Sequence, residues 1–69
     1  MIEVGTKIVG NWGPMHSYSY GRVVAIDDMI VVDFDDVPGY THYPLNHDFK
    51  SAECIREIGV YIDHEGLVY

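Results

Sequence analysis

Residues 18–36, YSYGRVVAIDDMIVVDFDD, decide the fold of this chain. They contain two runs rich in Val, Ile and aromatic side chains, residues 18–26 and 29–34, and such runs are typical of β-strands. Asp27 and Asp28 separate the runs and predict a two-residue hairpin turn, although Asp-Asp fits a type I′ turn less well than Asn-Gly. The stretch therefore predicts a β-hairpin whose open end carries acidic and aromatic residues.

The register of this hairpin predicts which face becomes the core. A two-residue turn places Ile26 opposite Met29, and it places Arg22 opposite Asp33 on the solvent face, a pair worth about 0.2–1 kcal/mol. The other face is entirely apolar, so we expect it to be buried. That face comprises Gly21, Val23, Ala25, Ile30, Val32 and Phe34. A bulge at Gly21 is an alternative that would move the preceding tyrosines to the opposite face.

The rest of the chain is cut into short segments by Gly and Pro, and no long helix is predicted. We expect a first strand at residues 7–9 and a fourth at 40–43, stopped by Pro44. A helical turn is expected at 46–49 and a fifth strand at 54–58. Residues 60–62 and 67–69 predict a C-terminal hairpin, with Gly66 in the left-handed region of the turn.

Length and composition predict one small all-β domain over residues 1–69. The chain has 69 residues, of which 48% are hydrophobic, enough for a core but for only marginal stability. Cys54 is the single cysteine, so an intrachain disulfide and a cysteine zinc site are excluded. A lone cysteine fits a reducing compartment, and we expect a cytoplasmic protein. Glu3 and the lack of long apolar runs predict neither a signal peptide nor a membrane span.

The net charge of the chain indicates which kind of partner it can bind. Eleven acids against four bases give a net charge of −7, which opposes phosphate backbones and argues against direct nucleic-acid binding. A basic protein or peptide surface is the natural counterpart of such a charge. No nucleophile elbow, phosphate loop or paired-carboxylate cleft is present, and the four histidines lack metal-ligand spacing. We therefore expect a protein that is not an enzyme and that needs neither a cofactor nor a metal.

Three segments carry a resemblance to a known family: VGTKIV at 4–9, YGRVVAI at 20–26 and IVVDFDD at 30–36, followed by HYPL at 42–45. Together they resemble an SH3-like small barrel, in particular the Tudor and related "Royal" domains, over roughly residues 4–58. The resemblance implies a barrel of five to six short antiparallel strands, to which the C-terminal hairpin is an addition. The intervening VPG at 37–39 departs from the usual family pattern after the third strand.

The same resemblance implies a binding surface, because Tudor-like domains enclose a cationic side chain with aromatic rings and an acid. The positions that match it are Trp12 with Tyr18 or Tyr20, Phe34 with Asp36, and Tyr40 or Tyr43. We predict that a basic protein segment is recognised by an acidic and aromatic surface. Its predicted members are Trp12, Tyr18, Tyr20, Asp33, Asp35, Asp36 and Tyr40.

Other interpretations stay open at this point. The aromatic residues can serve mainly as core, Phe34 first among them, and the crowded aspartates can be a solvated hairpin. The runner-up function is a small acidic inhibitor of phage or mobile-element origin that imitates DNA and blocks a host nucleic-acid-binding enzyme. A third is a structural protein that forms homo-oligomers through an exposed edge strand at 67–69.

Overall fold

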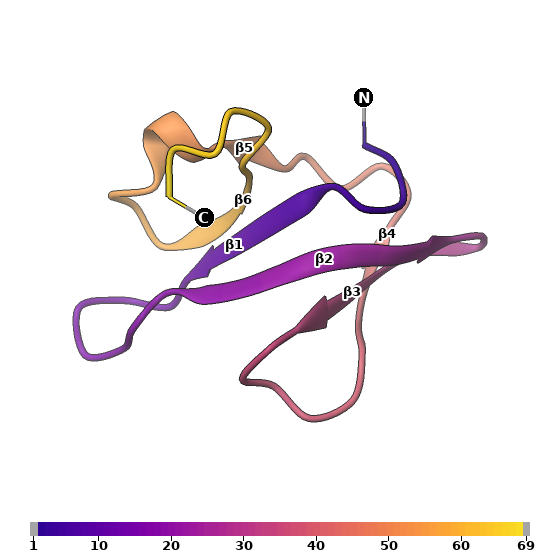
Figure 1. Ribbon diagram of the computed structural model, residues 1–69, viewed down its shortest axis with the longest axis horizontal. Helices are drawn as coiled ribbons and strands as arrows, with labels where there is room; N and C mark the ends of the chain where they lie inside the picture. Colours follow the sequence, from indigo (N-terminus) through magenta and orange to yellow (C-terminus); the bar gives the residue numbers. More distant parts are fainter. Residues whose placement is uncertain (1, 69) are drawn as a thin grey trace.

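The computed structural model describes residues 2–68 as one six-stranded sheet that curls into a half barrel (Figure 1). The strands lie in the order β4-β3-β2-β1-β6-β5. This all-β architecture confirms the predicted fold class and is compatible with a small SH3-like barrel. The elements are β1 (Lys7–Asn11), β2 (Ser19–Ile26), β3 (Met29–Phe34), β4 (Thr41–Pro44), β5 (Lys50–Ser51), the 3₁₀ helix η1 (Ala52–Cys54) and β6 (Gly59–Ile62).

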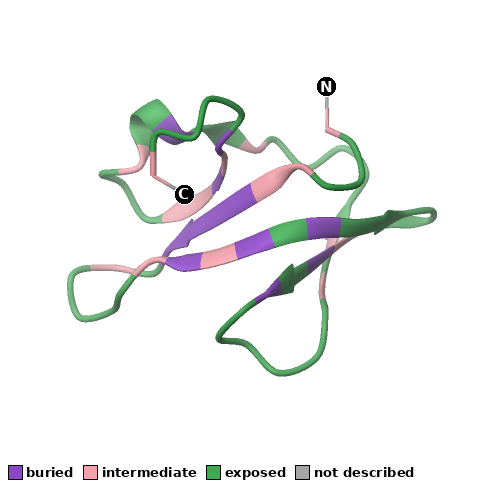
Figure 2. Cartoon of the chain, viewed as in Figure 1, coloured by how far each residue is buried: buried purple, intermediate pink, exposed green. Residues whose placement is uncertain are grey.

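The core lies on the inner face of the curled sheet, where alternate residues of β2 and β3 are buried (Figure 2). Its central cluster consists of Ile8, Val23, Ile30, Val32 and Phe34, against which Ile2, Tyr43, Phe49, Val60 and Ile62 pack. Gly21 pairs with Phe34 without a bulge, and Arg22 pairs with Asp33 as predicted. The predicted core face is therefore correct except at Ala25, near the closed end of the hairpin, which is exposed.

The register at the closed end of the β2–β3 hairpin differs from the prediction. Ile26 pairs with Ile30 instead of Met29, because the register shifts by one residue at Val24. A type I′ turn would need both aspartates at positive φ, whereas only glycines have positive φ among residues 2–68. The hairpin instead places the extra residue in a β-bulge, which leaves Ala25 exposed and outside the core.

Strand β1 is buried on both of its faces. Ile8 points into the barrel core, while Val9 lies on the opposite face beside its register partner Tyr61. The connection between the parallel strands β5 and β6, residues 52–58, lies against this opposite face, because Asn11 donates to the carbonyls of Ile55 and Glu57 and the Tyr61 hydroxyl donates to the Glu57 carbonyl. Ala52 is buried within the connection. This second layer explains why Val9, Ala52 and Tyr61 are buried although none belongs to the central cluster.

The predicted helical turn at 46–49 and strand at 54–58 are both wrong. Residues 45–46 form a turn in which the His47 backbone N–H donates to the Pro44 carbonyl at 3.0 Å. The helical turn falls later, at η1, where Ser51 caps it by accepting from the Glu53 N–H. The Asn11 side chain donates to the carbonyls of Ile55 and Glu57, so these carbonyls bind a side chain instead of a neighbouring strand.

The C-terminal hairpin is formed only in its first half. Strand β6 and the turn are present, with Gly66 at φ +68°. Residues 67–68 lie off the sheet, because the buried Asp63 carboxylate accepts the N–H groups of Leu67 at 2.7 Å and Val68 at 3.0 Å. Tyr69, the last residue of the predicted edge strand, lies outside the described residues. Strands β4 and β5 form the edges of the sheet.

An aromatic cluster is formed by β4 and the connection from β4 to β5. Tyr43 in β4 contacts His47 and Phe49, with ring centroids 4.9 and 5.2 Å apart, and His47 and Phe49 are 4.5 Å apart. Burial raises the pKa of the Tyr43 hydroxyl above its ordinary value. Tyr43 and Phe49 also pack against the central cluster, so these rings extend the core beside β4. Among residues 2–68, no helix is long and apolar enough to cross a membrane.

Candidate functional site

The strand order brings two loops to one end of the barrel, which we call the mouth. Strands β1, β2, β3 and β4 are consecutive antiparallel neighbours, so the β1–β2 loop and the β3–β4 loop leave the sheet at the same end. These loops, residues 12–18 and 35–40, carry five of the seven predicted binding residues. The turn at Asp27 and Asp28 lies at the opposite end of the β2–β3 hairpin (Figure 1).

Trp12 is held firmly although its residue surface is 38% exposed. Its indole ring covers Gly10, where a Cβ atom would lie 2.7 Å from Cε2 and 2.8 Å from Cη2 of the ring. The ring also packs edge-on against the buried Phe34, with centroids 5.8 Å apart and an interplanar angle of 75°. A side chain larger than hydrogen at position 10 would displace the indole. Trp12 therefore closes the core at the mouth and presents part of its ring to solvent.

A hydrogen-bonded chain joins this indole to a carboxylate. The Trp12 Nε1–H donates to the Ser19 hydroxyl at 2.6 Å, and that hydroxyl donates to Asp36 Oδ2 at 2.9 Å. Ser19 is only 1% exposed, whereas Asp36 is exposed. The buried hydroxyl can satisfy both groups because it is a donor and an acceptor at once. We call Trp12, Ser19 and Asp36 the indole–carboxylate surface.

Two other predicted residues are close in sequence to the members of this surface but do not complete an aromatic cage, the set of rings that encloses a cation in Tudor-like domains. Tyr40 follows Asp36 in the β3–β4 loop and is 62% exposed, while Tyr18 precedes Ser19 and is half-buried. Within residues 2–68, neither ring makes an aromatic contact with Trp12; the ring that does so is Phe34. The structure therefore presents a single fixed indole beside an acid, with no closed set of three or four rings.

The remaining predicted residues are placed differently. Asp33 follows Val32 and precedes Phe34, both buried in the core, so its side chain lies on the outer face of β3. Tyr20 likewise alternates with the buried Ser19 and Gly21 and lies on the outer face of β2.

Asp35 lies directly after β3. Its backbone N–H donates to the Tyr20 carbonyl at 2.8 Å, which extends the strand pairing by one residue. Asp35 is exposed and stands next to Asp36 in the chain. Of the predicted acids, Asp36 is thus the one that the structure connects to an aromatic side chain.

Sequence reasoning missed Ser19. A serine between two tyrosines at the start of a strand has no spacing that marks it as a link between two loops. The signal that could have found it is indirect: Ser19 shares the inward face with Gly21 and Phe34, where a polar residue needs a hydrogen-bond partner. The Trp12 indole N–H and an acid of the next loop are the groups within reach.

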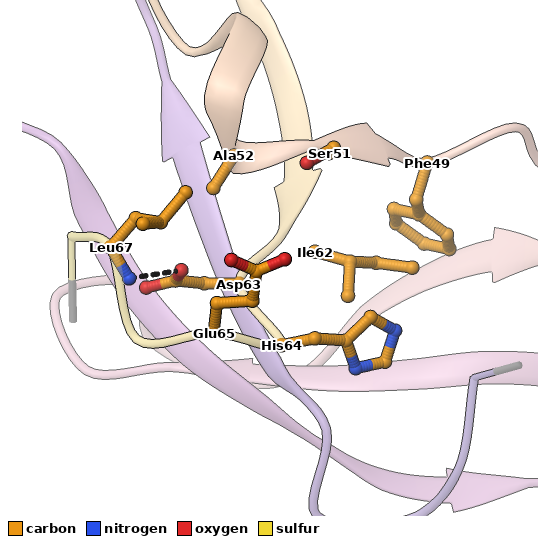
Figure 3. Close-up of a pocket in the computed structure, with 8 residues that line it drawn as sticks. All are labelled: Phe49, Ser51, Ala52, Ile62, Asp63, His64, Glu65 and Leu67. Atoms are coloured by element: carbon orange, nitrogen blue, oxygen red, sulfur yellow. Dashed lines mark hydrogen bonds between the residues drawn. The ribbon is translucent and has the colours of Figure 1, made fainter.

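The surface also has hollows away from the mouth. One hollow, of about 250 Å³, lies between residues 49–52 and the C-terminal turn. Figure 3 shows its lining residues, with the Asp63 carboxylate directed at the Leu67 backbone N–H. That carboxylate is already engaged by two backbone N–H groups. In the described part of the chain, no group of three or more His, Cys, Asp or Glu could hold a metal ion. Cys54 is exposed and unpaired.

Comparison of the chain with known protein families, with curated proteins and with solved structures finds no match.

Proposed function

We propose that this protein is a non-enzymatic binding module that recognises a basic protein segment through the indole–carboxylate surface at the barrel mouth. The observation that carries the proposal is the chain from Trp12 through Ser19 to Asp36, which fixes a carboxylate beside a partly exposed indole. In the same loop, Asp35 precedes Asp36 and Tyr40 follows it; both are exposed and would add charge and apolar contact. An indole and a carboxylate together attract a Lys or Arg side chain.

The chemistry of the surface favours a cationic partner for two reasons. The indole face attracts a cation through its quadrupole, a contribution of about 0.5–1 kcal/mol at exposed sites. The Asp36 carboxylate uses Oδ2 for Ser19, and within residues 2–68 its Oδ1 has no hydrogen-bond partner. A partner donor can therefore bind Asp36 without breaking the internal chain. The net charge of −7 would add a long-range attraction that speeds association and weakens with salt.

Binding of a fluorescein-labelled oligoarginine peptide, measured by fluorescence anisotropy, tests the proposal. Asp36→Asn keeps an oxygen that can accept from Ser19 but removes the charge, so the fold is retained. We expect it to weaken binding by about fivefold, the equivalent of one exposed charge pair of about 1 kcal/mol. Asp48→Asn is the matched control, because it removes the same charge from an exposed position before β5.

The two variants separate specific recognition from general attraction. Weaker binding by Asp36→Asn with little change in Asp48→Asn supports recognition at the mouth. Equal affinities for the two variants, or a wild-type protein that does not bind the peptide at 0.05 M salt, would contradict the proposal. Trp12→Phe provides a second test. If the protein imitates DNA through its charge alone, this variant should bind the peptide as well as the wild type. If a cation binds on the indole face, binding should weaken, because Trp binds cations better than Phe.

A further inference from the structure

A hollow on the side of the β1–β2 loop differs in charge from the rest of the surface. It has a volume of about 280 Å³ and lies between this loop and residues 56–58 of the β5–β6 connection. Its lining consists of Asn11, Gly13, Pro14, His16, Tyr18, Arg56 and Ile58. It is separate from the indole–carboxylate surface, since Trp12, Ser19 and Asp36 take no part in it.

The two walls of this hollow are joined at their base by a buried side chain. Asn11 Nδ2 donates to the carbonyls of Ile55 and Glu57 in one wall, and Asn11 Oδ1 accepts from the Gly13 N–H in the other, at 3.0 Å. Asn11 is buried, so these bonds are shielded from water. The His16 N–H donates to the Gly13 carbonyl at 3.2 Å and closes the turn above. The hollow is therefore preformed, which lowers the entropic cost of binding a ligand.

The lining carries no carboxylate, although eleven of the 69 residues are acidic. The three other hollows described for this surface each include at least one of Glu3, Asp48, Asp63 and Glu65. Arg56 lines this hollow, and within residues 2–68 it makes no hydrogen bond or ion pair. The hydroxyl of Tyr18 and the imidazole of His16 likewise have no side-chain hydrogen bond there. Three polar groups that can donate to an anion thus line one acid-free recess.

We propose that this hollow binds a compact oxyanion, a phosphate or carboxylate group, with Arg56 as its principal contact. A guanidinium offers several N–H donors in a fixed fork that matches the oxygens of either group. His16 and Tyr18 supply further donors, and Pro14 and Ile58 form an apolar wall for whatever carries the anion. The site is independent of the binding function proposed for the mouth and takes a ligand of opposite charge.

Backbone amide chemical shifts of the ¹⁵N-labelled protein, titrated with inorganic phosphate and separately with acetate, test this assignment. Sodium chloride at matched ionic strength corrects for general salt effects. We expect saturable shifts at residues 13–18 and 55–58, absent with chloride alone. Shifts with both anions indicate a site for the shared oxyanion chemistry, and shifts with phosphate alone or acetate alone assign a phosphate or a carboxylate ligand; all three results support the site.

Arg56→Gln should weaken this binding by at least about tenfold, since a charge-assisted hydrogen bond contributes about 1.5–3 kcal/mol. Lys50→Gln is the matched control: it removes the same charge from another exposed cation that is unpaired within residues 2–68 and lines a hollow containing Asp48. Both residues are exposed, so both variants should fold. Shifts no larger than those with chloride, or equal weakening by Arg56→Gln and Lys50→Gln, would overturn the proposal.

Discussion

Replacement of Ser19 by alanine removes one oxygen atom and breaks both bonds of the indole–carboxylate chain. Trp12 Nε1–H would lose its acceptor at 2.6 Å, and Asp36 Oδ2 would lose its donor at 2.9 Å. Because Ser19 is 1% exposed, water has little access to take its place. A net hydrogen bond contributes about 0.5–1.5 kcal/mol, and a partly buried donor left without a partner adds to the loss, so we expect about 2 kcal/mol of destabilisation.

Urea unfolding followed by the fluorescence of Trp12, the single tryptophan, measures this loss directly. For a chain this small, with a denaturant slope of about 1 kcal/mol per molar urea, the midpoint should fall by about 2 M. Ser17→Ala is the control, because Ser17 is an exposed serine of the same loop without a hydrogen bond in the described part of the chain. A loss below about 0.5 kcal/mol, the lower limit for one net bond, would refute the hydrogen-bonded chain.

Three further perturbations test other parts of the structure. Gly10→Ala places a methyl group where the Trp12 ring lies, so we expect a loss of about 1–3 kcal/mol and a red shift of the tryptophan emission; unchanged emission would contradict the ring position. Asn11→Ala leaves the Ile55 carbonyl and the Gly13 N–H without their partners, while the Glu57 carbonyl loses one donor and keeps the Tyr61 hydroxyl. The loss of three bonds should cost about 3 kcal/mol in urea unfolding, against little for the exposed Asn46→Ala; equal losses would count against the Asn11 bonds. Burial raises the Tyr43 pKa above 10.0, so the native state keeps this proton to higher pH than the unfolded chain, and stability is full below pH 10 and falls above it. Tyr43→Phe should reduce that alkaline loss, measured as the free energy of unfolding at pH 9 and 11, and an identical loss in both proteins would exclude Tyr43 as its source.

Apolar alternation was sufficient to predict the centre of the sheet. Val23, Val32 and Phe34 lie on the core face as the sequence pattern predicts, because a strand buried on one face leaves a period of two in its sequence. The pattern was not sufficient at the closed end of the hairpin. There Asp27 and Asp28 keep negative φ, and the register changes through a bulge at Val24. A bulge leaves the residue composition of the two strands unchanged, so the apolar pattern does not reveal it.

The errors at residues 54–58 and 67–68 have a different cause, which is polar side chains that bind backbone N–H and carbonyl groups. Asn11 binds carbonyls at Ile55 and Glu57, which keeps that segment from forming a strand. Asp63 binds the N–H groups that a last strand would have used. A polar side chain that competes with sheet pairing in this way leaves no periodic signal in the sequence.

The candidate site, like the fold, could be predicted from the sequence only in part. The meander of β1–β4 is enough to bring the loops of Trp12 and Asp36 to one end of the barrel, and the sequence predicts these four strands and the hairpin formed by the second and third. It does not reveal that Ser19 joins the two residues. The predicted register does place Asp33 on the solvent face, the outer face on which Tyr20 also lies. The predicted seven-residue surface is accordingly reduced to a smaller one around Trp12 and Asp36.

The most direct test of the proposed binding function is the indole N–H resonance of Trp12, since one tryptophan gives one such signal. The ¹⁵N-labelled protein is titrated with an unlabelled oligoarginine peptide, and this signal is followed in the wild type and in Asp36→Asn. We predict a saturable shift in the wild type that is weakened by about fivefold in Asp36→Asn. An indole signal that stays unmoved while the peptide saturates the protein would contradict recognition at the mouth.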